Sequence, residues 1–461
     1  MDLSTFTDGS TPKEEEKPAI EYTAQVSSPF VNGEAVLTIT DSALTISSLF
    51  DTDEVAFAGM NALELADYVV TVRADAGDYV FSKLGNWCQP FYDALYDAYN
   101  KAVLSALFAS GEPVLTAKGV YGSAENGAAL QNAVPIHVYE NSVIALPPDL
   151  SARRVPLCFV SGMEKTDYSL TLRLDTGESY TYSKLGYDTV IFADAIEKQI
   201  RTMREKALAE IRELDPAVTT AQASQLAKRM QSGIAAEFGA IAAISPSFAA
   251  TLNSKFAETG AAEYYKELKE LCNPAQIYIG FEKNKTPDDG KGDSTGIMGG
   301  LSGITGGLPG IMGSLSGITE GLPDITGGLS DIIGGNIKSG ETDAAPQEQF
   351  RFWLIIPSPD GRHAVVEFSE ADTATFVYCT DGDFHAFARR INRALEAIAF
   401  KREVIRLTDD DLRKPENDTY YMANKRTAAL QFVRAKFKGR AIHSSPESWK
   451  RNLLACFEGV D

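Results

Sequence analysis

Residues 67–78, DYVVTVRADAGD, return one hundred positions later as residues 167–178, DYSLTLRLDTGE. After one inserted residue the match resumes, with SKLG at 82–85 and again at 183–186. Each copy alternates apolar and polar residues, which is typical of a strand with one buried face, and each ends in an Asp-x-Gly turn. An offset that stays near 100 residues indicates an internal duplication.

The composition of the 461-residue chain limits its function class. Hydrophobic residues make up 44% and charged residues 23%, the profile of a globular protein with a sizeable core. A net charge of −20 argues against general nucleic-acid binding. Five scattered cysteines and four histidines match no metal-ligand spacing, so we predict no metal site, no cofactor and a reducing, cytoplasmic setting.

Each copy is predicted to be a run of short antiparallel strands followed by a long amphipathic helix. The strands are expected within Glu34–Phe81 and Val134–Tyr182. The apolar stripe of the first helix is predicted to hold Trp87, Phe91, Leu95 and Ala98, and that of the second Phe192, Ile196, Ile200, Met203, Ala207 and Ile211. Residues 34–109 and 134–210 should therefore superpose, with Asp75 and Asp175 in matching hairpin turns.

Six or seven strands closed by a carboxy-terminal helix resemble the pleckstrin-homology-like (PH-like) fold in its bacterial versions, over residues 20–110 and 115–214. The resemblance implies an α+β protein with tandem PH-like antiparallel barrels. It also implies binding of phospholipid head groups or peptides, without supplying the residues. Lys83 and Lys184 end equivalent strands and are candidates for an anion contact, the alternative being ordinary solvated lysines.

The Asp-x-Gly pair also suggests a two-lobed aspartic protease, in which two carboxylates share a proton. That chemistry needs apolar surroundings, whereas Arg73 and Arg173 lie two residues before the aspartates and Ala76 replaces the usual hydroxyl. A tight turn explains both copies without catalysis. We therefore predict no catalytic residue and a non-enzymatic protein; an enzyme assembled from distant residues stays an alternative.

The middle of the chain is predicted to be a helical connector, 215–273, followed by a third domain. In the connector, Leu226, Met230, Ile234, Phe238 and Ile241 would give a first helix its core side, and Pro246 would start the next. The third domain is predicted to consist of 274–282 and 350–400, four strands and then a helix.

The Gly-rich segment 283–349 is predicted to be an insert in the hairpin between the first two strands of the third domain. Its large apolar residues alternate four and three apart, but 14 of the 40 residues from 296 to 335 are glycine, which disfavours an isolated helix. We expect a mobile segment whose deletion (296–337) leaves stability nearly unchanged, because loop closure depends weakly on length. Self-association or contact with a lipid interface are its functional alternatives.

The carboxy-terminal arm, 401–461, is predicted to be helical and basic. Arg434, Lys436, Lys438 and Arg440 surround Phe437 and are candidates for an anion contact, unless they neutralise acidic surfaces of the same chain. A last helix should begin at Ser445-Pro446-Glu447. This arm resembles the ends of uncharacterised bacterial proteins, which carry over no activity.

Together these features predict a cytoplasmic adaptor or scaffold, preceded by a disordered tail, 1–19. Its tandem PH-like domains would bind a protein partner or a phospholipid head group. The alternative is a peripheral membrane protein that uses the Gly-rich repeat for membrane contact or self-assembly.

Overall fold

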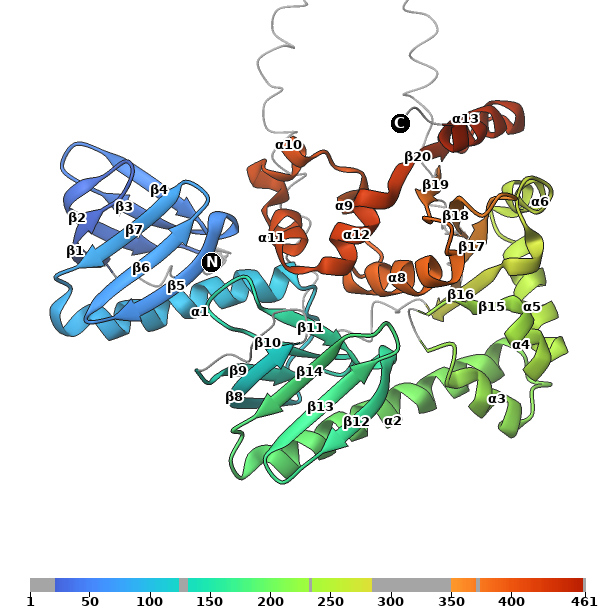
Figure 1. Cartoon of the computed structure of the whole chain (residues 1–461), viewed down its shortest axis with the longest axis horizontal. Coiled ribbons are helices and arrows are strands. Elements are labelled where there is room, and N and C mark those ends of the chain that lie inside the picture. The colour runs from blue at the N-terminus through green and yellow to red at the C-terminus, as the bar shows by residue number, and fades with distance from the viewer. Residues whose placement is uncertain (1–20, 124–131, 232–233, 284–349, 370–373, 459–461) are drawn as a thin grey trace, which may run out of the picture. The chain divides into compact units, whose positions relative to one another are not determined.

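The computed structural model of the chain describes residues 21–123, 132–231, 234–283, 350–369 and 374–458 (Figure 1). These residues fall into two compact units. The first runs to Phe108 and adds Ala145–Arg153 and Asp418–Arg426, and the second contains the remainder. The amino-terminal tail and almost all of the Gly-rich insert lie outside the described residues, so the predictions made for them stay predictions.

The first repeat is a seven-stranded antiparallel sheet followed by a long helix. The strand order is β4-β3-β2-β1-β7-β6-β5. The elements are β1 (Glu21–Ser27), β2 (Asn32–Ile39), β3 (Ala43–Ser47), β4 (Thr52–Ala56), the 3-10 helix η1 (Phe57–Gly59), β5 (Met60–Ala66), β6 (Val69–Ala74), β7 (Gly77–Ser82), the 3-10 helix η2 (Gly85–Trp87) and α1 (Cys88–Ala106).

Helix α1 buries one face against this sheet, and the predicted stripe is partly shifted. Phe91 and Leu95 are buried as expected, and Phe91 packs edge-on to Phe81 of β7. Trp87 precedes the helix and is exposed, and Ala98 is only half-buried. Instead, Tyr99 and Val103 continue the buried stripe, because the spacing of 3.6 residues per turn carries it to 99 and 103.

The second repeat has the same strand order, β11-β10-β9-β8-β14-β13-β12. The elements are β8 (Leu115–Ser123), β9 (Val134–Val138), β10 (Ser142–Ala145), β11 (Arg153–Pro156), the 3-10 helix η4 (Leu157–Phe159), β12 (Val160–Lys165), β13 (Ser169–Leu174), β14 (Ser179–Ser183) and α2 (Asp188–Leu214). The stripe predicted for α2 is buried, apart from the half-buried Met203.

The two repeats match in the turn that holds Asp75 or Asp175 as well as in their strand order. The backbone N–H of Asp75 donates to the carbonyl of Gly59, and that of Asp175 donates to the carbonyl of Phe159, both at 2.9 Å. Both aspartates therefore lie in equivalent hairpin turns, as predicted. They belong to different compact units, so the structure lends no support to a shared catalytic pair.

The α+β class is confirmed, but neither sheet closes into the predicted barrel. Among the described residues, β4 and β5 form the two edges of the first sheet and β11 and β12 those of the second. The first strand of each sheet, β1 and β8, lies ahead of the range in which we predicted strands. Strand β1 pairs with β7 and so joins β2–β4 to β5–β7, and β8 pairs with β14 and so joins β9–β11 to β12–β14.

The third sheet has six strands in the order β15-β16-β17-β18-β19-β20. Its strands are β15 (Ala236–Glu237), β16 (Tyr278–Lys283), β17 (Phe350–Pro357), β18 (His363–Phe368), β19 (Ala374–Cys379) and β20 (Phe437–Ile442). Strands β16 and β17 pair antiparallel from Tyr278↔Ile355 to Lys283↔Phe350, which confirms the predicted hairpin on either side of the insert.

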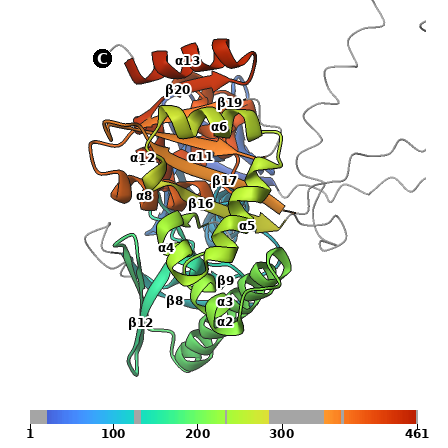
Figure 2. The same ribbon diagram turned by 90° about the vertical axis from the view of Figure 1, so that its right-hand side faces the viewer.

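Helices cover both faces of the third sheet (Figure 2). The helices and 3-10 helices of this part of the chain are α3 (Thr220–Ala227), α4 (Phe238–Ile244), α5 (Pro246–Ala257), α6 (Ala262–Leu271), η5 (Pro274–Gln276), α8 (Phe384–Ala397), α9 (Glu403–Arg406), α10 (Asp409–Leu412), η6 (Pro415–Asn417), α11 (Asp418–Arg426), α12 (Ala428–Lys436) and α13 (Pro446–Glu458). One core joins α3–α6 and α13 to alternate residues of β17, such as Leu354. On the opposite face, Tyr378 of β19 packs against Phe387 of α8.

In two places the structure has a strand where the sequence predicted helix. The single helix expected through Leu226 and Ile241 is two helices, α3 and α4, with the two-residue strand β15 between them. Of the basic residues around Phe437, Arg434 and Lys436 end helix α12, whereas Lys438 and Arg440 lie on strand β20, where they are exposed and Ala441 is buried. Helices α5 and α13 begin at Pro246 and Pro446 as predicted.

The β5–β6 turn carries local strain that can be removed. Asp67 and Tyr68 form a two-residue turn with φ of 51° and 60°, a conformation suited to Asn-Gly. Replacing Asp67 with Asn and Tyr68 with Gly should raise the free energy of unfolding by about 1–2 kcal/mol, measured by urea denaturation. Tyr168→Gly is the control: Tyr168 does not share the positive φ, so stabilisation by that change would contradict the explanation.

Candidate functional site

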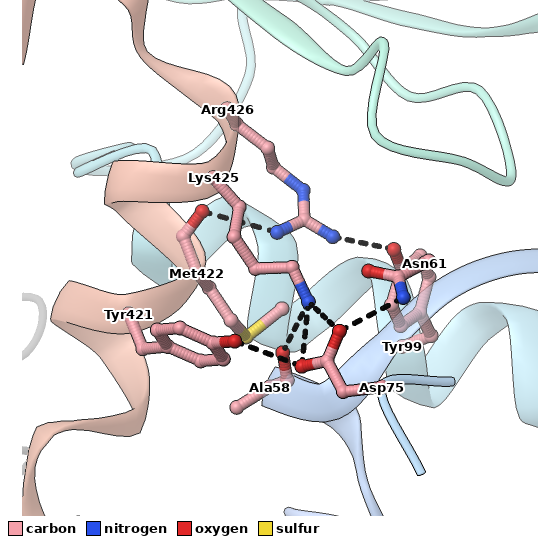
Figure 3. Close-up of polar contacts among 8 residues, drawn as sticks. All are labelled: Ala58, Asn61, Asp75, Tyr99, Tyr421, Met422, Lys425 and Arg426. Atoms are coloured by element: carbon pink, nitrogen blue, oxygen red, sulfur yellow. Dashed lines mark hydrogen bonds and ion pairs between the residues drawn. The ribbon is translucent and has the colours of Figure 1, made fainter. Parts of the chain in front are cut away.

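Asp75 is the centre of a polar site on the first repeat (Figure 3). Its turn joins β6 to β7, and Gly77 completes the turn with φ of +128°. The hydrogen bond from Asp75 to Gly59 holds the turn against η1, so the carboxylate lies beside the carbonyl of Ala58. Two acceptors are thereby placed side by side, one of them charged.

Helix α11 supplies the donors to this site, from about 350 residues further along the chain. Lys425 Nζ lies 3.0 Å from both carboxylate oxygens of Asp75 and 3.3 Å from the carbonyl of Ala58. The Tyr421 hydroxyl donates to Asp75 at 2.9 Å, and Asn61 Nδ2 does so from β5 at the same distance. Asp75 therefore accepts from three side chains, two of them on α11.

Arg426, the next residue of α11, is buried beside the same site. Only 1% of its surface is exposed. Its guanidinium donates to the Tyr99 hydroxyl of α1 and to the carbonyl of Met422, and it lies over the Tyr99 ring at 5.6 Å. Its Nε has no hydrogen-bond partner among the described residues.

Burial and pairing act in opposite directions on the charges of this site. Burial alone would raise the pKa of Asp75, but the hydrogen bonds from Asn61, Lys425 and Tyr421 outweigh it and hold that pKa below its usual value. Burial lowers the pKa of Lys425, and the Asp75 carboxylate offsets only part of that effect. The hydrogen bonds to Asp75 therefore stabilise its charged form.

The equivalent face of the second repeat also holds a helix from later in the chain. Cys158, in the position equivalent to Ala58, is enclosed beside Arg393 and Glu396 of α8, and burial raises the pKa of its thiol well above the usual range. Glu396 pairs with Arg154 of β11, with contacts of 2.6 and 2.8 Å. Arg393 donates to the carbonyl of Arg154 at 3.1 Å. The same face therefore contacts a charged helix in each unit.

Asp175 differs from Asp75 in the direction of its pKa shift. Burial, followed by the charge of Glu178, raises the pKa of Asp175 to about 6, against a weaker effect of Arg389. The folded state then binds the proton more tightly than the unfolded chain does. Because of this group, the free energy of unfolding falls as the pH rises from 3.8, the ordinary pKa of an aspartate, to about 6.

Asp175→Asn should therefore stabilise the protein at pH 7 and leave it unchanged at pH 3.5. The gain should stay below about 1 kcal/mol, because the side chain is partly solvated. Urea denaturation across this pH range measures it. Asp75→Asn should have the opposite sign, lowering stability at neutral pH. A stabilising Asp75→Asn or a destabilising Asp175→Asn would contradict these environments.

A buried Glu–His pair lies within the core of the third sheet. Glu367 of β18 is fully buried, and its carboxylate lies 3.1 Å from His443 Nε2. Thr375 donates to the same carboxylate and accepts from Trp449 Nε1 of α13 at 2.8 Å. Tyr264 of α6 stacks on the His443 ring at 3.8 Å. These contacts connect α6 and α13 to the sheet.

The anion-contact candidates of the first two domains lie in equivalent but separate places. Lys83 and Lys184 are exposed, with φ of 58° and 54°, each directly after the last strand of its sheet. They belong to different compact units, and the structure provides no test of an anion contact at either. Their role therefore stays a prediction.

The carboxy-terminal candidates divide into two pairs. Arg434 binds Asp409 at 2.9 Å and the carbonyl of Val404, and Lys436 binds Asp381 at 2.6 Å. These two cations neutralise acidic groups of the same chain, which is the alternative weighed above. The other two, Lys438 and Arg440, are exposed on β20.

Sequence reasoning missed an apolar surface on the first repeat. Phe30 in the β1–β2 turn and Leu49 and Phe50 in the β3–β4 turn are 62%, 91% and 92% exposed. We call these three residues the tip patch. The available signal was an apolar pair inside a polar turn, with Ser48 before it and Asp51 after it.

Three further features concern the described residues. No group of three or more His, Cys, Asp or Glu side chains among them could hold a metal ion. A cavity of about 420 Å³ lies in the second unit, lined by Glu213, Leu214, Lys255, Glu258, Thr259, Phe350 and Phe352. None of the helices that the structure describes is both long enough and apolar enough to span a bilayer.

Comparison with protein-family models and with curated proteins gives no match. Among solved structures, the chain is similar to one described as "Structure of the Spt16D Pob3N heterodimer". The two are 9% identical, and the similarity covers 34% of this chain and 86% of that chain, with a TM-score of 0.14. At this TM-score the similarity supports no conclusion about what the chain binds.

Proposed function

We propose that the chain is a non-enzymatic adaptor or scaffold with two PH-like repeats, and that it binds a protein partner through the first repeat. The observation that carries this proposal is the tip patch on an acidic surface. Residues 21–108 contain 12 Asp or Glu and three Lys or Arg, a net charge of −9. Residues 115–214 contain 13 Asp or Glu and 11 Lys or Arg, a net charge of −2, so of the two repeats only the first is strongly acidic.

Strand pairing supports a common location for the tip patch. Strands β1, β2, β3 and β4 are successive antiparallel neighbours, so the β1–β2 and β3–β4 turns lie at the same end of the sheet. Asp51 lies in the second turn and Glu54 in β4, and both are exposed. The patch thus combines large exposed apolar side chains with nearby carboxylates.

This chemistry favours a basic protein over an anionic lipid surface. Exposed apolar side chains that form a contiguous patch mark contact sites, whereas singly scattered ones do not. An anionic membrane attracts cations by about 1 kcal/mol for each Lys or Arg near the surface and repels carboxylates. A protein with an apolar pocket and a basic rim would satisfy both parts of the patch.

The test compares the full chain with a Leu49→Ser/Phe50→Ser variant, with Tyr68→Ser as the matched control. Tyr68 is 81% exposed in a different turn of the same repeat. In capture experiments from the source cell, the double change should reduce recovery of specific basic proteins about fivefold or more, and the control should not. Flotation with vesicles containing about 30% phosphatidylserine should show no binding.

Two results would overturn the proposal. One is binding to these vesicles that depends on Leu49 and Phe50. The other is protein capture that the double variant leaves unchanged. Membrane contact through the Gly-rich repeat, the alternative function, concerns residues outside the described part of the chain. Vesicle binding that is lost on deletion of 296–337 and kept in the tip variant would favour that alternative.

A further inference from the structure

Helix α11 has the geometry of a ligand bound to the first repeat. Among the described residues of the carboxy-terminal half, only its nine, Asp418–Arg426, belong to the first compact unit, whereas Asn417 and Thr427 on either side belong to the second. Tyr421 and Lys425 are four residues apart, so they share one helix face and reach Asp75 together (Figure 3).

The receiving surface is preformed by the first repeat. The Asp75 carboxylate is held by its own turn and by Asn61, and the carbonyl of Ala58 comes from η1. Tyr99 is supplied by α1 and accepts from Arg426. None of these groups comes from the carboxy-terminal half of the chain, so a helix from another molecule could make the same contacts.

The internal helix fills this surface imperfectly. The guanidinium of Arg426 is buried with Nε unpaired, and a buried unpaired donor costs about 1–3 kcal/mol. Lys425 is also largely removed from water. These costs reduce the affinity of α11 for its site, whereas the net charge of −9 on the repeat attracts any basic helix.

We propose that α11 is a displaceable internal ligand, and that the first repeat binds in trans a basic helix of a partner protein with Tyr at one position and Lys-Arg four and five residues later. The partner's lysine would occupy the place of Lys425 on Asp75, and its arginine that of Arg426 on Tyr99. This site is distinct from the tip patch. The inference adds a second, competitive binding mode to the proposed adaptor.

The test uses the full chain and a fluorescein-labelled peptide of residues 415–428 as the probe. In the parent the internal helix competes, so the peptide should bind weakly. Lys425→Met disables the internal ligand and should tighten peptide binding about tenfold, because the competent fraction rises. Adding Asp75→Asn to that variant should remove the gain. Fluorescence anisotropy measures the affinities, and circular dichroism verifies folding.

Asp78→Asn is the matched control, because it removes one exposed carboxylate from the same repeat without touching α11. It should change peptide affinity by less than about twofold. Arg426→Met is a second route to the disabled helix if Lys425→Met fails to fold.

The inference is wrong if neither disabled variant binds the peptide more tightly, or if Asp75→Asn leaves the gain intact. The proposed partner is wrong if the parent sediments as a dimer that Asp75→Asn dissociates. In that case the helix bound at Asp75 would be α11 of a second copy of the chain. The Leu49→Ser/Phe50→Ser variant should bind the peptide as the parent does. If the peptide test fails while protein capture still depends on Leu49 and Phe50, the inference is wrong and the proposed function is retained.

Discussion

Replacing Glu396 with alanine should lower the free energy of unfolding by about 3–5 kcal/mol. The side chains of Arg154 and Glu396 are only 7% and 10% exposed, and Glu396 also lies 3.7 Å from Arg393. Its removal would leave two buried guanidinium groups without this carboxylate, and an uncompensated buried charge is far costlier than a lost surface pair. Urea denaturation followed by far-UV circular dichroism provides the measurement.

Glu164→Ala is the matched control in the second repeat. Glu164 pairs with Arg173 at 2.9 Å, but both side chains are more than half exposed. Its loss should cost less than about 1 kcal/mol. Equal effects of the two changes would show that water screens the Glu396 pairs and would contradict their burial.

Gly280→Ala should destabilise the third sheet by about 1–3 kcal/mol through overpacking. Gly280 of β16 is paired with Trp353 of β17, and a Cβ atom at 280 would lie 2.3 Å from the indole ring. Carbon atoms prefer about 3.5–4.0 Å, so the ring would have to move. It has little room, because Trp353 is fully buried and packs on Phe400 at 4.7 Å.

Gly239→Ala and a rescue variant make this prediction specific. A Cβ at Gly239 in α4 meets nothing closer than 4.0 Å, and alanine favours helix, so this change should be neutral or stabilising by up to about 1 kcal/mol. Trp353→Phe should recover part of the stability lost in Gly280→Ala, since the smaller ring leaves space. A neutral Gly280→Ala would show that Trp353 does not lie across the glycine.

Much of the fold could be predicted because its signals are local. The alternation in 67–78 and 167–178 reports which face of each strand is buried, and Asp-x-Gly reports the turn. Both signals act within a few residues. The matched hairpins followed from these two signals, helix α2 from the helical spacing of its apolar residues, and the β16–β17 hairpin from the apolar runs on either side of the insert. All three are confirmed.

Predictions failed where a distant partner decided the local structure. Strand β20 forms because it pairs with β19, although the whole arm from residue 401 was predicted to be helical. Similarly, the two-residue strand β15 interrupts the predicted helix because it pairs with β16. In both cases, hydrogen bonds to a strand remote in sequence outweigh the weak helix propensity of a short segment.

The candidate site lay beyond sequence reasoning for the same reason. The sequence by itself determined the duplication, the strand-and-helix order of each repeat and the acidic charge of the first one, since these depend on neighbouring residues and on composition. Only the tertiary structure placed Lys425 on Asp75 and Glu396 on Arg154. Each pair spans more than 200 positions, and a lone charged residue carries no signal of its partner until folding removes both from water.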